Sequence, residues 1–176
     1  MARKSNTKKI TLIAMLAALS VALLYVGSFI EVLDLSVAVL ASLLCIVAVI
    51  EYGHGTAWAL FALSAILSLL ILPNKMPAIV YTAFFGYYPI IKEKLEKHLR
   101  KWLSWIVKIV IFNAAILLML VASKYLLTAN AEAPVFDILF IALAEVTLVI
   151  YDIALTRVIT LYIFKIRKRF KFLNKR

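Results

Sequence analysis

Long uncharged apolar stretches recur along this chain of 176 residues, and they constrain its fold more than any other feature. About 20 consecutive apolar residues in a helix cross the hydrocarbon core of a bilayer. Hydrophobic residues make up 65% of the chain, whereas a soluble domain is about half apolar. Inside lipid each backbone polar group needs a partner within the protein, so helices are the expected elements. The sequence therefore predicts an all-α integral membrane protein.

Six apolar runs, separated by polar breaks, predict a bundle of six transmembrane helices in one domain that covers residues 1–176. The expected spans are residues 10–30, 35–50, 56–72, 78–91, 102–126 and 135–164. The fourth span is short, because its 14 residues reach only ~21 Å as a helix, against a hydrocarbon core of ~30 Å. A start at Met76 lengthens it, because Pro77 is tolerated in a first helical turn.

Basic residues are concentrated on one side of this predicted bundle. If the N-terminus is cytoplasmic, that side holds four basic residues before residue 10, five between Lys92 and Lys101, and seven in the basic tail at residues 165–176. These are 16 of the 20 Lys and Arg residues, as the positive-inside rule requires. Without the fourth span the tail would lie outside. The charges thus favour six spans over five in the cell membrane, with both termini cytoplasmic.

The formal net charge of +11 also raises nucleic acid as a partner. The basic residues flank apolar spans instead of covering a folded domain, so membrane lipid is the expected partner and nucleic acid is not. The sequence contains no glycine-rich phosphate loop or metal motif, and His54, His98 and Cys45 are isolated. We expect neither enzymatic activity nor a cofactor or a metal.

Polar side chains inside the spans need an explanation, because lipid offers them no partner. Asn113 and Glu145 lie at similar depths, and they either bind a ligand or ion or join two helices by a hydrogen bond. Asp152 lies two helical turns after Glu145 and faces nearly the same way. A structural ion pair between Lys108 and Asp152 is favoured over a proton or ion relay. Arg157 needs another partner or reaches the surface.

Acidic, amide and aromatic residues gather at the predicted outer ends of the spans. A pocket that opens outward would be built from these loops and span ends, and a solvated rim with an aromatic belt is the alternative. The candidate substrate-binding residues are Glu31, Asp34, Asn74, Lys75, Tyr81, Asn113 and Glu145.

Small residues recur every four positions in the first span, at Ala14, Ala18 and Ala22. Such a ridge lets another helix approach closely. That helix belongs either to the same bundle or to a partner protein.

The ridge, the basic termini and the acidic outer loops of a small six-helix protein resemble the substrate-binding S component of energy-coupling-factor (ECF) transporters. The most similar stretch begins with Lys9-Ile10-Thr11-Leu12-Ile13-Ala14 and runs to Ala22. The resemblance implies that the three alanines contact a transmembrane coupling subunit driven by two ATPases. It also implies capture of a vitamin-like molecule or an ion from outside. The chain shows no pocket signature for riboflavin, thiamine or biotin, so the substrate stays open.

A non-enzymatic scaffold or assembly protein of the cell envelope, similar to rod-shape-determining membrane proteins, is the alternative function. A scaffold would bind its partner through the basic tail or the polar segment at residues 92–101. An intramembrane enzyme that uses Glu145 and Asp152 is disfavoured, because no His, Ser or Thr at matched depth completes a catalytic set.

Overall fold

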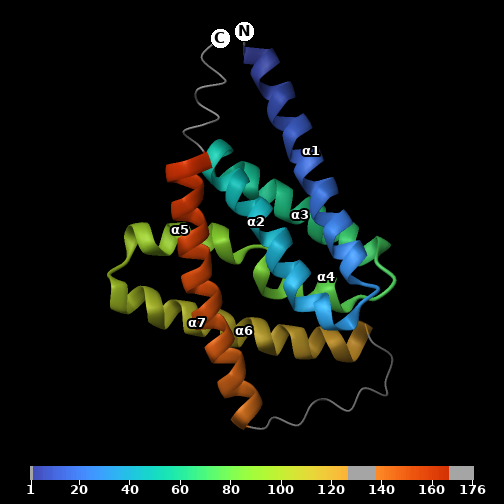
Figure 1. Ribbon diagram of the computed structural model, residues 1–176, viewed down its shortest axis with the longest axis vertical. Coiled ribbons are helices and arrows are strands. Elements are labelled where there is room, and N and C mark those ends of the chain that lie inside the picture. The colour runs from blue at the N-terminus through green and yellow to red at the C-terminus, as the bar shows by residue number, and fades with distance from the viewer. Residues whose placement is uncertain (1, 127–137, 167–176) are drawn as a thin grey trace. The chain divides into compact units, whose positions relative to one another are not determined.

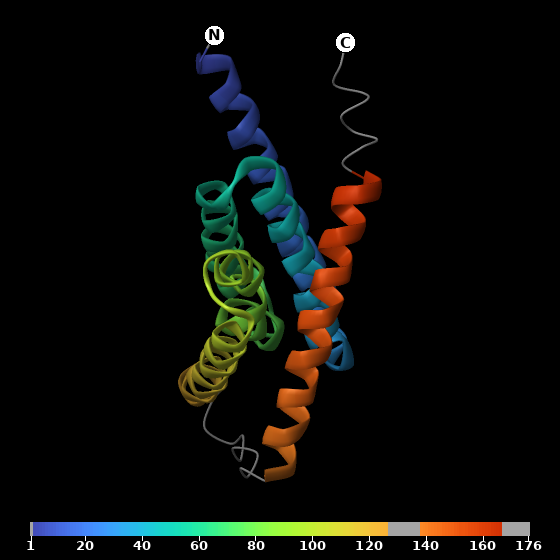
Figure 2. The same cartoon turned by 90° about the vertical axis from the view of Figure 1, so that its left-hand side faces the viewer.

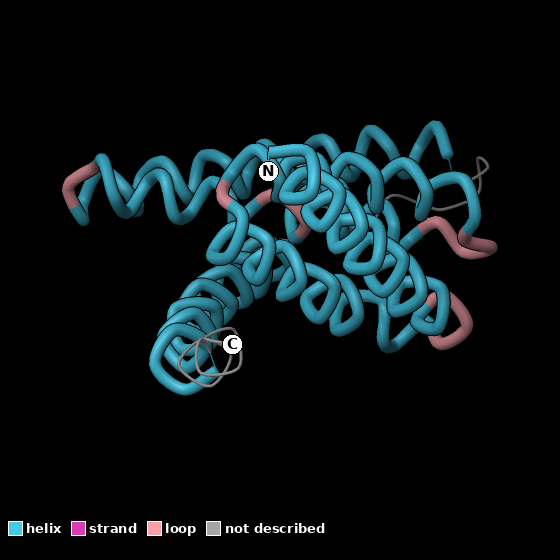
Figure 3. The backbone as a smooth tube through the Cα atoms, turned by 90° about the horizontal axis from the view of Figure 1, so that it is seen from above, coloured by secondary structure: helices cyan, strands magenta, loops and turns pink. Residues whose placement is uncertain are grey.

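The computed structural model describes residues 2–126 and 138–166, in which helices are joined by short loops (Figure 3). The chain forms two compact units, Met1–Ala133 and Pro134–Arg176. Whether these units form the one transmembrane domain expected from the sequence depends on how they assemble, so the single domain stays a prediction. The connection between the predicted fifth and sixth spans, the beginning of the sixth span and most of the basic tail lie outside the described residues.

The first three apolar runs form long helices, namely α1 (Ala2–Gly27), α2 (Asp34–Tyr52) and α3 (His54–Ile71). Figures 1 and 2 show α1 alongside α2. A short 3-10 turn, η1 (Glu31–Leu33), precedes α2. The connection from α2 to α3 is the single residue Gly53, whose φ of +86° lies in the left-handed region that favours glycine. α2 and α3 therefore form a tight antiparallel hairpin.

The central element of the first unit is α2, which packs against α1, α3, α4, η2 and α5. Its buried face carries mostly small side chains at helical spacing. Small residues at a helix interface let neighbouring backbones approach closely, which replaces the hydrophobic effect as a source of stability in lipid. The buried residues of α2 are Val37, Ala38, Ala41, Ser42, Cys45, Ile46, Ala48 and Val49.

The predicted fourth span is a broken helix in the structure. It consists of α4 (Met76–Val80), the π-helical turn η2 (Tyr81–Phe85) and α5 (Tyr88–His98). The Gly86 amide donates to the Tyr81 carbonyl at 2.7 Å, which is the i→i+5 bond of a π turn. Pro89 lacks an amide hydrogen and cannot continue the preceding ladder. The break therefore lies where the sequence places glycine and proline.

Segment 76–93 follows α3 along its whole length. At the end of α3, Lys75 Nζ donates to the Leu72 carbonyl at 2.6 Å. At its beginning, His54 Nε2 lies 3.2 Å from Glu93 Oε2, without the alignment of a hydrogen bond. α3 has 18 residues, or ~27 Å at the helical rise of 1.5 Å per residue. The broken segment thus begins at one end of α3 and reaches the other.

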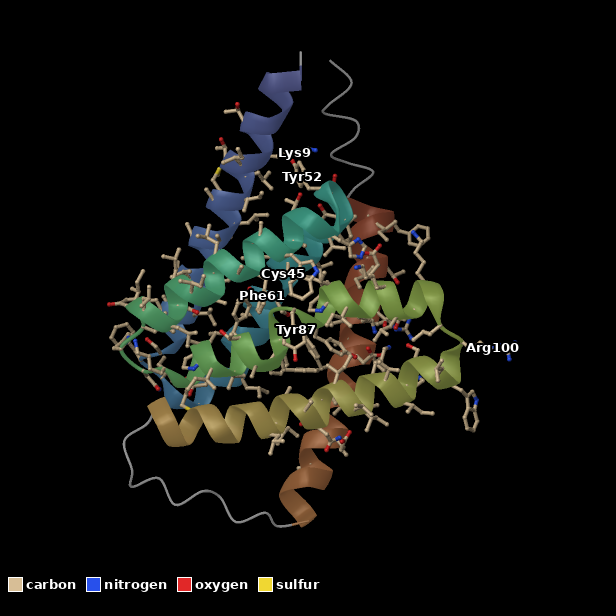
Figure 4. All side chains as sticks on the ribbon, turned by 180° about the vertical axis from the view of Figure 1, so that it is seen from behind. Lys9, Cys45, Tyr52, Phe61, Tyr87 and Arg100 are labelled. Atoms are coloured by element: carbon tan, nitrogen blue, oxygen red, sulfur yellow. The ribbon has the colours of Figure 1, made fainter. Side chains whose placement is uncertain are left out.

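Helix α6 (Lys101–Leu126) follows α5 after the two-residue turn Leu99-Arg100. It packs against α4, η2 and α5. Figures 1 and 4 show α5 and α6 side by side and running in opposite directions. This α5–α6 hairpin completes the first unit.

The second unit contains α7 (Ile138–Leu161) and the π-helical turn η3 (Tyr162–Ile166). Four helices in the described part of the chain are long and apolar enough to cross a membrane. Their apolar windows are Lys9–Gly27, Asp34–Tyr52, His54–Ile71 and Glu145–Lys165. Helix α6 carries a shorter apolar run, Trp102–Leu117. The helical class and the apolar character of these four segments agree with the prediction from sequence.

Candidate functional site

Four predicted substrate-binding residues gather at one end of the first unit. Because α2 and α3 are antiparallel, the turn before α2 lies beside the turn after α3, as Figures 1 and 3 show. Glu31 begins η1 and Asp34 begins α2. Asn74 and Lys75 form the other turn, which precedes α4. This polar end is built from residues distant in sequence, as the outward pocket hypothesis requires.

Two side chains at the polar end form hydrogen bonds with backbone groups. Asn74 Oδ1 accepts the Met76 amide hydrogen at 3.0 Å and thereby satisfies the beginning of α4. Lys75 Nζ donates to the Leu72 carbonyl at 2.6 Å. Helix ends leave backbone groups without intrahelical partners, and side chains of this kind supply them. A ligand at this end would compete with these two capping contacts.

The structure places Tyr81, expected at the outer rim, in the interior. Its side chain is fully buried. Its hydroxyl shares a hydrogen bond of 2.9 Å with Ser64 Oγ and one of 3.3 Å with Cys45 Sγ. Ser64 and Cys45 lie near the middles of α3 and α2, so the phenol reaches mid-depth from η2. The π turn directs this side chain inward, and hydropathy alone gives no sign of it.

An aromatic cluster surrounds this position, and sequence reasoning missed it. Phe84 in η2 lies 4.6 Å from Tyr88 and 4.9 Å from Phe112 of α6, measured between ring centroids. Phe61 of α3 lies 5.8 Å from Tyr87 and 6.0 Å from Tyr81, and Figure 4 labels Phe61 and Tyr87. Each such pair contributes about 0.5–1.5 kcal/mol beyond its buried area. The run of Tyr and Phe at positions 81–88 was the available signal.

A charged cluster joins α5 to α6. Glu96 Oε1 lies 3.1 Å from Lys92 Nζ and 2.7 Å from Lys108 Nζ, and both lysine side chains are buried. Lys108 Nζ also lies 5.2 Å from the ring centroid of Trp105. Two buried ammonium groups thus share one half-exposed carboxylate. Removing one partner of such a group is costly, because a buried charge loses its compensation.

The pairing of Lys108 with Glu96 was not predicted from the sequence. Lys92 and Glu96 are separated by one helical turn, and the short Leu99-Arg100 turn brings Lys108 opposite them. That spacing was a readable signal. The predicted pair of Lys108 with Asp152 joins the two units and stays a prediction.

The remaining polar candidates lie on α6 and α7. Asn113 is exposed on α6, and its Nδ2 donates to the Ile109 carbonyl of its own helix at 3.0 Å. Glu145, Asp152 and Arg157 all lie on α7, in the second unit. A contact between Asn113 and Glu145 would join the two units, and it also stays a prediction.

The alanine ridge of α1 is exposed. Ala14, Ala18 and Ala22 are all accessible, whereas the helix buries a different face that includes Ala17 and Leu24. α1 contacts α2 and α3 within its own unit. Within the first unit the ridge is thus not covered by another helix, and both alternatives for its partner helix stay predictions.

The described residues form hydrogen bonds and ion pairs between helices, a polar end of the first unit, and an exposed face of small side chains on α1. Within them, no group of three or more His, Cys, Asp or Glu residues is arranged to hold a metal ion. The chain matches no protein-family model, no curated protein and no solved structure.

Proposed function

We propose that this chain is the substrate-capture membrane subunit of a small-molecule uptake transporter of the ECF type. The observation that carries the proposal is the exposed alanine ridge of α1. Alanine side chains let a second helix approach to backbone distance, which is how helices associate in lipid. α1 already packs on α2 and α3 through another face. The ridge thus suits a separate membrane protein, which here is the coupling subunit.

The proposal includes six transmembrane helices and two cytoplasmic termini. The fourth of these helices is short and broken. Support comes from the path of segment 76–93 along α3, since Lys75 lies at one end of that helix and Glu93 contacts the other. A segment that accompanies a helix of ~27 Å covers nearly the thickness of a hydrocarbon core. The basic residues that follow it then lie on the cytoplasmic side.

In this arrangement the polar end of the first unit faces outward and receives the substrate. Glu31, Asp34, Asn74 and Lys75 gather there, and two of them also cap helix ends. The Asp34 carboxylate, the Asn74 amide and the Lys75 ammonium group in one place suit a small polar molecule or an ion. The buried hydroxyl of Tyr81 acts below this end as a structural contact between three helices.

The experiment is co-purification of the full chain from its native membranes in mild detergent. We expect the unaltered protein to carry a second integral membrane protein and ATP-hydrolysing subunits. The double variant Ala14→Trp/Ala18→Trp should lose them at least ten-fold, because indole rings block close helix approach. The control is Ala59→Trp/Ala62→Trp, which places the same bulk at two exposed alanines of α3 and should retain the partners.

Both double variants must elute as single species in size exclusion, so that loss of a partner is not loss of fold. Retention of the complex by the α1 variant would overturn the coupling role of the ridge. Recovery of cell-envelope assembly proteins without any ATPase would support the scaffold function instead.

A further inference from the structure

The turn between α5 and α6 presents two cations and an indole to the outside. Lys97 and Arg100 are exposed, and Trp102 is 87% exposed. These residues lie within six positions of one another across the Leu99-Arg100 turn. A tryptophan so exposed is unfavourable in water, whereas the ring is favoured at the boundary between lipid headgroups and acyl chains. The residues of this α5–α6 turn therefore combine charge with an apolar anchor.

The acidic residues of α5 do not neutralise the turn. Glu96 contacts the buried Lys92 and Lys108. Glu93 contacts His54 at the beginning of α3. Both carboxylates are 44–45% exposed, but each contacts a partner within the first unit, whereas Lys97 and Arg100 add two exposed positive charges at the turn.

We infer that the α5–α6 turn is a docking surface for anionic phospholipid at one face of the membrane. Lys97 and Arg100 would contact the phosphate groups, and Trp102 would enter the interface beside the same molecules. Charge complementarity supports this occupant, because each basic residue near an anionic leaflet adds to the attraction. The exposed indole next to the cations fits an amphiphile better than a soluble acidic protein. The inference depends on membrane embedding and not on the transport function.

Fluorescence of Trp102 tests the inference in nanodiscs that contain the full chain. The variant Trp58→Phe/Trp105→Phe leaves Trp102 as the single indole. The discs contain phosphatidylcholine with a minor fraction of phosphatidylglycerol. Brominated acyl chains, which quench tryptophan on contact, are carried at equal mole fraction either by one lipid or by the other. We expect stronger quenching by brominated phosphatidylglycerol, and a smaller difference at high salt.

Substitution of the two cations then tests which residues are responsible. In the single-tryptophan background, Lys97→Gln/Arg100→Gln should lower the preference for phosphatidylglycerol by about five-fold for each charge removed. The matched control, Lys9→Gln/Lys165→Gln, removes two other exposed basic side chains and should keep the preference. Far-ultraviolet circular dichroism verifies that each variant retains its helical content.

Three results would overturn the inference. Equal quenching by both brominated lipids in the parent would show that the turn does not select anionic headgroups. An unchanged preference in Lys97→Gln/Arg100→Gln would assign the selection to other residues. Absence of quenching by either lipid would place Trp102 away from the bilayer.

Discussion

The Tyr81 hydroxyl joins three elements of the first unit through one oxygen atom. It contacts Ser64 Oγ at 2.9 Å and Cys45 Sγ at 3.3 Å, and Ser64 also donates to the Leu60 carbonyl. Tyr81→Phe keeps the ring and removes the oxygen. We expect the free energy of unfolding to fall by about 0.5–1.5 kcal/mol, measured by thermal or denaturant unfolding in mild detergent.

The comparison for this substitution is Tyr25→Phe, because the side chain of Tyr25 is exposed on α1. Removal of the Tyr25 hydroxyl oxygen should leave the free energy of unfolding unchanged within error. Equal stability of Tyr81→Phe and Tyr25→Phe would mean that the buried hydroxyl contributes nothing net.

Two glutamates one turn apart on α5 differ in the partners that they contact, and so in their expected contribution to stability. Glu96 is shared by the buried Lys92 and Lys108, whereas Glu93 contacts the partly exposed His54. Glu96→Gln should lower the free energy of unfolding by about 1.5–3 kcal/mol, as for hydrogen bonds to charged groups. Glu93→Gln should cost at most about 1 kcal/mol, as for exposed pairs. Unfolding titrations with denaturant measure both variants. Equal midpoints for Glu96→Gln and Glu93→Gln would contradict a special contribution of the shared carboxylate to stability.

At the scale of elements, Gly86 permits the junction between η2 and α5. A β-carbon at this position would lie 2.6 Å from Phe61 Cδ2 and Cε2, and 2.9 Å from Tyr81 Cζ. Tyr81 is fully buried, and Phe61 packs against the rings of Trp58, Tyr81 and Tyr87, so neither ring can simply rotate away. Gly86→Ala should therefore destabilise the protein by about 1–3 kcal/mol through overpacking.

Gly55 is the matched control for this junction, since a β-carbon there meets nothing within 4 Å. Gly55 lies in α3, where alanine favours the helix, so Gly55→Ala should be neutral or stabilising by up to about 1 kcal/mol. Thermal unfolding of both variants compares them directly. A stable Gly86→Ala protein would contradict the close packing of η2 on α3.

The first three helices could be predicted from the sequence because their limits are local. Glu31, Gly53 and Pro73 interrupt the apolar runs, and the helices begin and end within a few residues of these breaks. The exception is the beginning of α1, which extends back to Ala2, because polar residues also form helices and the limit of an apolar run does not mark their beginning. Local signals thus decide where most of these elements lie.

The fourth segment and its contacts could not be predicted in the same way. Hydropathy reports composition, and it does not distinguish an i→i+4 ladder from the i→i+5 turn at Tyr81. The inward position of that phenol depends on Ser64 and Cys45, which lie on two other helices. Of the candidate site, the sequence indicated the residues of the polar end, while their capping contacts depend on how the chain folds at the ends of α3 and α4.

At the scale of the whole molecule, the proposed topology places Pro73 and Lys97 on opposite sides of the membrane. Both side chains are exposed. In a Cys45→Ser background, Pro73→Cys should react with a membrane-impermeant maleimide added to intact cells. Lys97→Cys should react only after the cells are opened, because segment 76–93 would lie between the two positions. Labelling of both from the same side would reduce the number of spans and reverse the orientation of everything after α4.

The interrupted ladder between α4 and α5 also bears on biogenesis. A continuous apolar helix can enter lipid unaided, since it satisfies its own amide and carbonyl groups. The stretch from Met76 to His98 contains a π turn and a proline. It therefore needs neighbouring helices to supply the missing hydrogen-bond partners as soon as it enters lipid. The α2–α3 hairpin, made earlier by the ribosome, supplies them. In the proposed topology, a chain synthesised without that hairpin would leave this stretch at the bilayer surface.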